Sequence, residues 1–175
     1  MTRSPYDRAK LRAQLARHEG RRLRVYRCTA GKLSIGIGRN LDDVGIRPAE
    51  QKALGITVAS VTRNGVTDAQ CDALVESDID GVERDLDREL PWWRTLSGVR
   101  QRVLLDMCFN LGIGCRAAPG RKARGLLAFI NTLTLIRLGN YTAAASAMCV
   151  SLWARQVGER ATRLADMMKT GKDAA

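Results

Sequence analysis

A long amphipathic helix over residues 67–90 is the feature that most limits the folds open to this chain. Thr67 and Gln70 have the spacing of a capping box, which marks a helix start. Apolar residues follow at intervals of four, four, three and four, and so share one helical face: Cys71, Val75, Ile79, Val82 and Leu86. Pro91 ends the pattern. A helix of this length is expected to connect two lobes.

The segments on either side of this helix have other periodicities. Residues 7–18 show helical spacing, and Gly20 ends that helix. Residues 23–40 alternate as a β-hairpin with its turn at 29–32. Residues 41–66 are rich in turn formers, and we assign them no element. Further helices are expected around residues 99–107, 126–133, 143–154 and 161–168.

This order of elements predicts an α+β, mainly α fold. A small β-hairpin or sheet lobe and a helical lobe would be joined by the long helix. Within a single domain of residues 1–175, we expect the β lobe at 20–66 and the connecting helix at 67–90. The helical lobe would combine residues 1–19 with 91–175. Trp92 and Trp93 are expected to pack between its helices.

The charge of the chain is large and uneven. With 29 Lys and Arg against 18 Asp and Glu, the net charge is +11, although residues 68–89 carry nine acids and only two arginines. The loop at 115–125 is strongly basic. Such a field favours an anionic partner, which leaves nucleic acid, a membrane surface and a cell-wall polymer open. A solvated surface that keeps the protein soluble explains the charge equally well.

Several protein classes are disfavoured by what the sequence lacks. No apolar run approaches the roughly 18–20 residues that span a bilayer, and the first residues contain no apolar signal-peptide core. The five cysteines form no C-x-x-C pair, and His18 is the only histidine, so we expect no metal site of the usual spacings. We expect mostly reduced, buried thiols.

Residues 18–41 contain the groups best placed for chemistry. Glu19 closes a helix, Cys28 ends the first strand, and Ser34 lies on the second. Gly36 and Gly38 leave one strand face bare, which suits close approach by a ligand. A carboxylic acid in a groove is a good general acid, and a thiol or hydroxyl can hold a water opposite it. By spacing alone, a surface glutamate and a packing cysteine are the commoner explanation.

The same segment closely resembles the active-site segment of phage-type lysozymes, the endolysins of glycoside hydrolase family 24, such as the T-even and lambdoid phage lysozymes. That family has Glu, eight residues, Asp or Cys, five residues, then Thr; here Glu19, Cys28 and Ser34 have both spacings. The strand Ser34-Ile35-Gly36-Ile37-Gly38 matches the family's second strand. Further matches extend the resemblance over about residues 7–171: 64–67, 109–112, Trp153, Gln156 and Arg160.

The resemblance implies an N-acetylmuramidase that cleaves the β-1,4 bond between N-acetylmuramic acid and N-acetylglucosamine in peptidoglycan, with inversion. Glu19 would protonate the leaving oxygen, while Cys28 and Ser34 would orient or activate water. Because the acid and a water molecule suffice, the reaction would need no metal or organic cofactor. Arg160 would pair with the catalytic glutamate. Matches to substrate-binding positions of the family complete the predicted site: Asn40, Phe109, Asn110, Thr132, Gln156 and Arg160.

The chain departs from the commonest Glu/Asp/Thr set at two positions. Ser34 keeps the hydroxyl of threonine, but the Cys28 thiol is mostly protonated at neutral pH unless cations such as Arg27 lower its pKa. Some relatives use this cysteine as a redox switch with a cysteine in an N-terminal anchor, which we do not find here. Arg39 has two possible roles: it could grip a substrate carboxylate, or it could pair with an acid such as Asp78, which we slightly favour.

The expected partner is peptidoglycan, with anionic outer-membrane lipid as a second possibility and no nucleic acid. The resemblance implies a monomeric endolysin that stays in the host cytoplasm until a holin gives it access to the periplasm and wall. A lytic transglycosylase, which forms 1,6-anhydro products, and a non-catalytic peptidoglycan-binding protein remain alternatives. A nucleic-acid binder is supported by charge alone, because the sequence has no helix-turn-helix, RNP or zinc signature.

Overall fold

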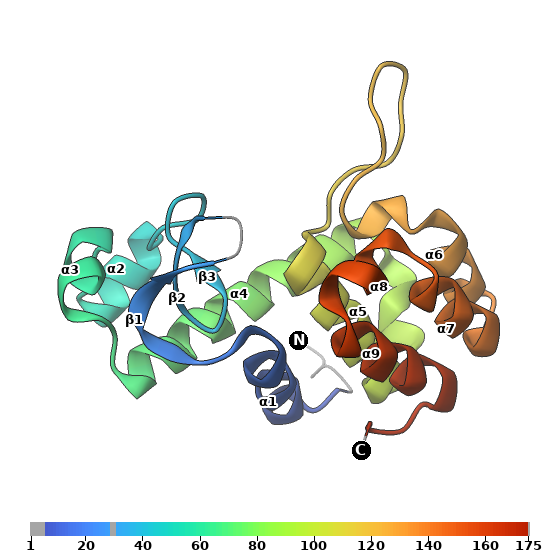
Figure 1. The fold of residues 1–175 in the computed structure, drawn as a ribbon, viewed down its shortest axis with the longest axis horizontal. Helices are drawn as coiled ribbons and strands as arrows, with labels where there is room; N and C mark the ends of the chain where they lie inside the picture. Colours follow the sequence, from blue (N-terminus) through green and yellow to red (C-terminus); the bar gives the residue numbers. More distant parts are fainter. Residues whose placement is uncertain (1–5, 29–30, 175) are drawn as a thin grey trace. The chain divides into compact units, whose positions relative to one another are not determined.

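A computed structural model describes residues 6–28 and 31–174 (Figure 1). The contacts divide the chain into two compact units. Unit 2 is Ala9–Gly81, and unit 1 combines Met1–Arg8 with Val82–Ala175. The elements are mainly helical with one small antiparallel sheet, so the predicted α+β, mainly α fold is confirmed.

The long helix α4, Asp68–Glu89, runs as predicted and contributes residues to both units. The Thr67 N–H donates to Gln70 Oε1 at 2.9 Å, and the Gln70 N–H donates to Thr67 Oγ1 at 3.1 Å, which is the predicted capping box. The predicted apolar face is buried at Cys71, Val75, Ile79 and Leu86, whereas Val82 is only half-buried.

Unit 2 begins with most of helix α1, Arg8–Glu19, followed by strands β1, Arg22–Arg27, β2, Leu33–Gly36, and β3, Arg39–Asn40. The strands lie in the order β1-β2-β3, and all pairings are antiparallel. The predicted hairpin is therefore present, although residues 29–30 of its predicted turn lie outside the described part of the chain. Its second strand is shorter than expected, because the backbone turns at Gly36 and Gly38, both with positive φ.

Residues 41–66, which were assigned no element, form two short helices. These are α2, Pro48–Leu54, and α3, Val58–Asn64. Each start is specified locally: the Arg47 N–H donates to the Glu50 carboxylate at 2.8 Å, and the Ser60 N–H donates to Thr57 Oγ1 at 3.1 Å. These helices are too short to show a clear apolar repeat, so only signals at their ends mark them, such as these caps and Pro48 at the start of α2.

Unit 1 contains the end of α4 and the helices that follow it, and Trp93 is fully buried in its core, as expected. Its elements are η1, Pro91–Thr95; α5, Gly98–Leu111; η2, Leu126–Ala128; α6, Ile130–Arg137; α7, Tyr141–Cys149; α8, Leu152–Val157; and α9, Glu159–Thr170. Helix α7 packs against α6 and α9, and α5 packs against α9.

Two predictions about element boundaries need correction. The helix expected over 126–133 is a 3-10 turn followed by α6, and Ile130 is 55% exposed rather than on the buried face. The helix expected over 143–154 is divided into α7 and α8, because Ser151 caps a new helix start by accepting from the Ala154 N–H. In the observed division into units, Ala9–Glu19 groups with the sheet-bearing unit, and the single domain of residues 1–175 with its expected lobes stays a prediction.

Candidate active site

Glu19 is the last residue of α1 and is half-buried in unit 2. Gly20 ends the helix with φ 77°, and its N–H donates to Ala16 O at 3.0 Å. A Cβ on Gly38 would lie 3.2 Å from Glu19 Cγ and 3.3 Å from Glu19 Oε2. The turn between β2 and β3 therefore lies against the Glu19 carboxyl, and the missing side chain of Gly38 makes room for that carboxyl.

Cys28 follows β1 directly, where the hairpin ladder continues: its N–H donates to Lys32 O at 2.9 Å. Its side chain is half-buried. Burial raises the pKa of Tyr26, and its electrostatic interactions with the Glu19 and Cys28 side chains raise it further, while Arg22 opposes them. Both predicted catalytic groups thus lie within electrostatic range of the Tyr26 hydroxyl, a residue to which sequence reasoning gave no role.

Ser34 lies on the central strand β2, paired with Tyr26 on one side and Asn40 on the other. Directly paired residues point to the same face of a sheet, so these side chains form a row across it. Ser34 is 3% exposed. The structure therefore places all three predicted catalytic residues, Glu19, Cys28 and Ser34, on neighbouring elements of unit 2.

The bare strand face predicted to receive a ligand is occupied by the protein itself. A Cβ on Gly36 would lie 3.3 Å from Cys71 Sγ on α4, and the space beside Gly38 is taken by Glu19. The glycines are needed, but for the packing of β2 on α4 and for the position of Glu19. Alternation alone could not distinguish these neighbours from a ligand.

Asn40, a predicted substrate-binding residue, has its side chain engaged in the turn that follows β3. Its Oδ1 accepts from the N–H groups of Asp42 and Asp43, each at 2.9 Å, and its Nδ2 donates to Asp43 Oδ2 at 2.9 Å. This is an Asx-type turn, in which the amide replaces backbone partners. The observed contacts of Asn40 are structural, and a substrate contact stays a prediction.

Arg39 has the structural role that the sequence favoured. Its Nε donates to Asp78 Oδ2 at 2.8 Å, and its Nη atoms donate to both Glu50 carboxylate oxygens at 2.8 Å. The remaining N–H groups reach Gly45 O and Leu74 O at 3.0 Å. All five guanidinium N–H groups are thereby used, and the residue is 2% exposed. Arg39 has no donor left for a substrate carboxylate.

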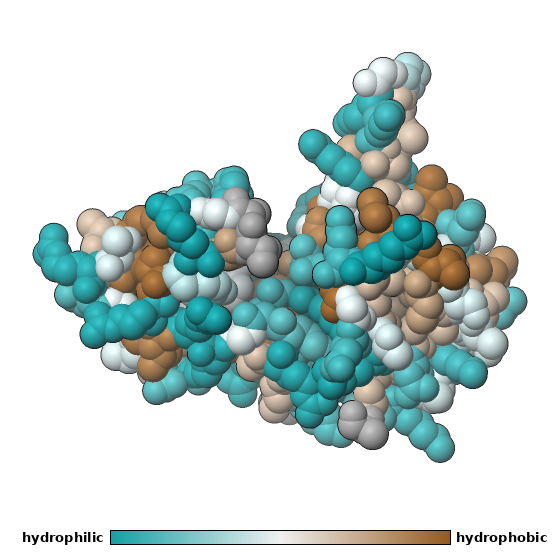
Figure 2. All heavy atoms as spheres, in the orientation of Figure 1, coloured by the Kyte–Doolittle hydropathy of each residue, from teal (hydrophilic) through white to brown (hydrophobic). Residues whose placement is uncertain are grey.

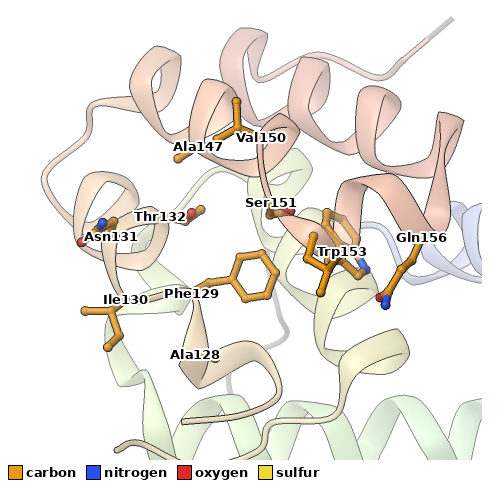
Figure 3. Close-up of a pocket in the computed structure, with 11 residues that line it drawn as sticks. Ala128, Phe129, Ile130, Asn131, Thr132, Ala147, Val150, Ser151, Trp153 and Gln156 are labelled. Carbon is orange, nitrogen blue, oxygen red and sulfur yellow. The ribbon is translucent and has the colours of Figure 1, made fainter. Parts of the chain in front are cut away.

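A groove of about 600 Å³ lies within unit 1 and contains two of the predicted substrate-binding residues, Thr132 and Gln156 (Figure 3). Phe129 and Trp153 meet edge to face in it, with ring centroids 5.9 Å apart. The Trp153 Nε1 donates to Asn110 Oδ1 at 2.9 Å, which ties the predicted residue Asn110 to the groove. An aromatic wall with flanking amides and a hydroxyl suits a polar ligand with apolar faces, such as a saccharide.

Phe109 and Arg160, also predicted to bind substrate, belong to unit 1 but do not line this groove. Arg160 is buried, and its Nε donates to Asp106 Oδ1 at 2.8 Å. Sequence reasoning missed Asp106, although an acid inside the apolar run of α5 signals a buried partner. The pairing of Arg160 with Glu19 that the resemblance implies stays a prediction.

The described residues contain no cluster of His, Cys, Asp or Glu that could hold a metal ion. The five cysteines, all within the described part of the chain, form no disulfide with one another. Among the described helices, none is both long and apolar enough to cross a membrane.

The mainly helical fold with one small antiparallel sheet agrees with the fold expected of a phage-type lysozyme. Residues 16–168 match the model of the phage lysozyme family, and the chain belongs to that family. It is 32% identical over 165 residues to the pre-baseplate central spike protein Gp5 of Enterobacteria phage T4, covering 90% of this chain but 27% of that protein. It is 24% identical over 172 residues to the probable T4-type lysozyme 1 of Dictyostelium discoideum, covering 93% and 95% of the two chains. Family membership supports a peptidoglycan-cleaving lysozyme.

Proposed function

We propose that this protein hydrolyses the β-1,4 bond between N-acetylmuramic acid and N-acetylglucosamine in peptidoglycan, with Glu19 as general acid. The observation that carries the proposal is the position of Glu19, half-buried at a helix end with its carboxyl against Gly38. A carboxylic acid held in one orientation can deliver its proton to the leaving glycosidic oxygen. The phage lysozyme family supplies the reaction class.

In this proposal Cys28 and Ser34 position or activate the attacking water. Cys28 is half-buried at the end of β1, so its thiol can meet water, while Ser34 is held on the central strand. Inversion requires space for that water between the acid and the activating group. If Cys28 activates no water, a transglycosylase reaction that needs only Glu19 becomes the alternative, and its 1,6-anhydro product distinguishes it.

The unit 1 groove is the proposed saccharide site. Phe129 and Trp153 offer aromatic surface to sugar rings, and Thr132 and Gln156 offer hydrogen bonds to their polar groups. Asn110 holds Trp153 in place, because its Oδ1 accepts a hydrogen bond from the Trp153 Nε1. Phe109, Asn40 and Arg160 complete the proposed set on the strength of the resemblance.

The biological role we propose is that of an endolysin in host-cell lysis. The protein would act as a monomer, remain in the host cytoplasm until a holin opens the inner membrane, and then reach the wall. Induced expression with and without a holin tests this route, because lysis should require both proteins.

The catalytic assignment is tested by release of soluble fragments from purified peptidoglycan. Glu19→Gln should abolish release, since the amide has no proton of suitable acidity to donate. Glu159→Gln is the matched control, because Glu159 is an exposed helix residue whose ion pair, among the described residues, is with Arg163 one turn away. Wild-type release by a folded Glu19→Gln protein would refute the assignment, and no release by reduced wild-type protein would favour a binding protein.

A further inference from the structure

The basic segment 115–125 forms an ordered β-hairpin that extends from the helices of unit 1 (Figure 1). Its arms pair at Cys115 with Arg124 and at Ala118 with Arg121. The tip is a tight turn through Pro119 and Gly120, closed by the Arg121 N–H donating to Ala118 O at 2.9 Å. Gly120 has φ 72°, which the third position of a type II turn requires.

The base of this hairpin is fixed by close contact between two backbone segments. A Cβ on Gly114 would lie 1.9 Å from Arg124 O, and one on Gly125 would lie 2.6 Å from Gly114 Cα. The Leu126 N–H donates to Gly112 O at 2.9 Å just below this crossing. Only glycines allow the two backbone segments to approach so closely at this point. The sequence therefore specifies a fixed hairpin and not an unstructured loop.

Cations without acidic partners cover the hairpin. Arg121, Lys122 and Arg124 are exposed and form no ion pair with any described residue, whereas Arg21 and Arg94 pair with acids of α4. The sequence contains no acid between Asp106 and Glu159. Arg121 and Arg124 face the small residues Ala118 and Cys115 across the ladder, which leaves both arginines room to reach outward. This charge is unneutralised within its own unit.

Apolar side chains adjoin the base of the hairpin. Arg116 and Arg137 line a small cavity of about 110 Å³ together with Trp92 and Ile130. Ile130 also lines the larger groove, beside Val150, which is 77% exposed, and Leu152, which is 68% exposed. Figure 2 shows hydrophobic residues close to the base of the hairpin. A cationic surface therefore continues into an exposed apolar one.

We propose that the hairpin of residues 115–125 and the adjoining apolar side chains bind the surface of a bilayer that contains anionic phospholipid. Headgroup phosphates would contact Arg121, Lys122 and Arg124, while exposed aliphatic side chains enter the interface beside Trp92. Nucleic acid fits less well, because the hairpin carries no aromatic residue to stack on bases and phosphodiesters gain nothing from exposed aliphatic groups. This binding does not depend on catalysis.

Vesicle co-sedimentation tests the proposal. Wild-type protein should bind phosphatidylglycerol-containing vesicles, should not bind pure phosphatidylcholine vesicles, and should dissociate as NaCl is raised. Because each cation near an anionic surface contributes about fivefold, Arg121→Gln/Lys122→Gln/Arg124→Gln should weaken partitioning on the order of 100-fold. Its matched control is Lys52→Gln/Arg63→Gln/Arg84→Gln, which removes the same charge from exposed residues elsewhere. Thermal melting verifies that each variant folds.

Comparison of the two triple variants distinguishes a local lipid-binding surface from a general effect of net charge. A loss confined to the hairpin variant supports a local lipid-binding surface, and a further loss in Leu152→Ser would support apolar insertion. Equal losses in both triple variants would show a net-charge effect and overturn the local site. The proposal would be overturned if the hairpin variant bound vesicles as tightly as the wild type. It would also be overturned if the wild type bound no vesicles, or bound duplex DNA but no vesicles. Peptidoglycan cleavage in the same samples shows independently whether the enzyme is active.

Discussion

The Glu19 carboxyl lies directly against Gly38, and a Cβ at that glycine would come within 3.3 Å of Glu19 Oε2. Contacts of that length are tighter than side chains normally tolerate, so a residue with a side chain must displace the carboxyl or the turn. Gly38 also has φ 72°, a conformation that disfavours any other residue. The orientation of the proposed acid thus depends on a residue that contributes no chemistry.

Gly38→Ala should therefore lower turnover of peptidoglycan by about tenfold or more, because a small displacement of a proton donor is costly. Gly55→Ala is the control: Gly55 has φ 64° in the same unit, but nothing lies within 4 Å of its added Cβ. Both variants carry a similar backbone strain of about 1–2 kcal/mol. Steady-state kinetics on folded protein should separate them, and equal turnover in the two variants would contradict the positioning role.

Arg39→Ala should destabilise unit 2 strongly, because it removes the buried guanidinium from Glu50 and Asp78 and leaves them only the part-exposed Arg47 as a described ion partner. Losing one member of a buried ion pair costs about 3–5 kcal/mol. Arg163→Ala removes an exposed pair with Glu159 and should cost about 0.5 kcal/mol or less. Urea denaturation measures both values. A cost for Arg39→Ala as small as that of the control would show that this network is not stabilising.

The same network should make stability depend on acid pH. Burial by itself would raise the pKa of Glu50, but hydrogen bonds from Arg39, Ser77 and the Arg47 N–H lower it to about 2. Since the folded pKa lies below the unfolded value, the stabilisation is complete above about pH 4.5 and is lost as the pH falls toward 2. The contribution is on the order of 3 kcal/mol.

Unfolding free energies measured between pH 6 and pH 2 test this dependence in the wild type and in Glu50→Gln, which cannot titrate. The wild type should lose more stability over this range than the variant, in which the slope between about pH 4.5 and 2 flattens. Glu159→Gln serves as the exposed control and should retain the wild-type slope. Identical slopes in wild type and Glu50→Gln would contradict the lowered pKa.

Cys28→Asp should keep or raise hydrolytic activity, because a carboxylate is a stronger base for water than a protonated thiol. Cys28→Ala should lower activity by at least tenfold if the side chain acts on water. Cys149→Ala, at an exposed cysteine of unit 1, provides the comparison. A folded but inactive Cys28→Asp protein would mean that the thiol has a role that a carboxylate cannot perform.

Gln156→Ala should raise KM about five- to tenfold with little change in kcat, because a groove residue contributes binding that is equal in ground and transition states. Gln51→Ala is a control in unit 2, where the Gln51 amide donates to Ile46 O and lies outside the groove. Kinetics with a soluble glycan fragment measure both constants. A fall in kcat with unchanged KM would contradict a binding role and indicate that Gln156 acts on the reacting groups.

Much of the fold could be predicted from the sequence, because strong local signals agreed with the tertiary packing. The Thr67–Gln70 capping box and the apolar repeat of α4 specified a helix whose start and buried face are as predicted. Short elements escaped prediction where a single side chain decides the geometry. Ser151 starts α8 in the middle of an apparent continuous helix, and the positive φ of Gly36 ends β2 early.

The sequence predicted residues of the candidate site but not their contacts. The resemblance to phage-type lysozymes singled out Glu19, Cys28 and Ser34, and the structure places them on neighbouring elements of one unit. Spacing could not show that Gly38 accommodates Glu19, because that contact joins residues far apart in the chain. The Arg160–Asp106 pair escaped for the same reason, since only the packed structure reveals which acid meets which arginine.

Hydrolysis with Glu19 as the general acid is best tested by mass spectrometry of the products from purified peptidoglycan. We expect fragments with reducing-end N-acetylmuramic acid from the wild type and none from Glu19→Gln. Fragments ending in 1,6-anhydro-N-acetylmuramic acid would contradict it, because they form without an attacking water and leave Cys28 and Ser34 with none to position.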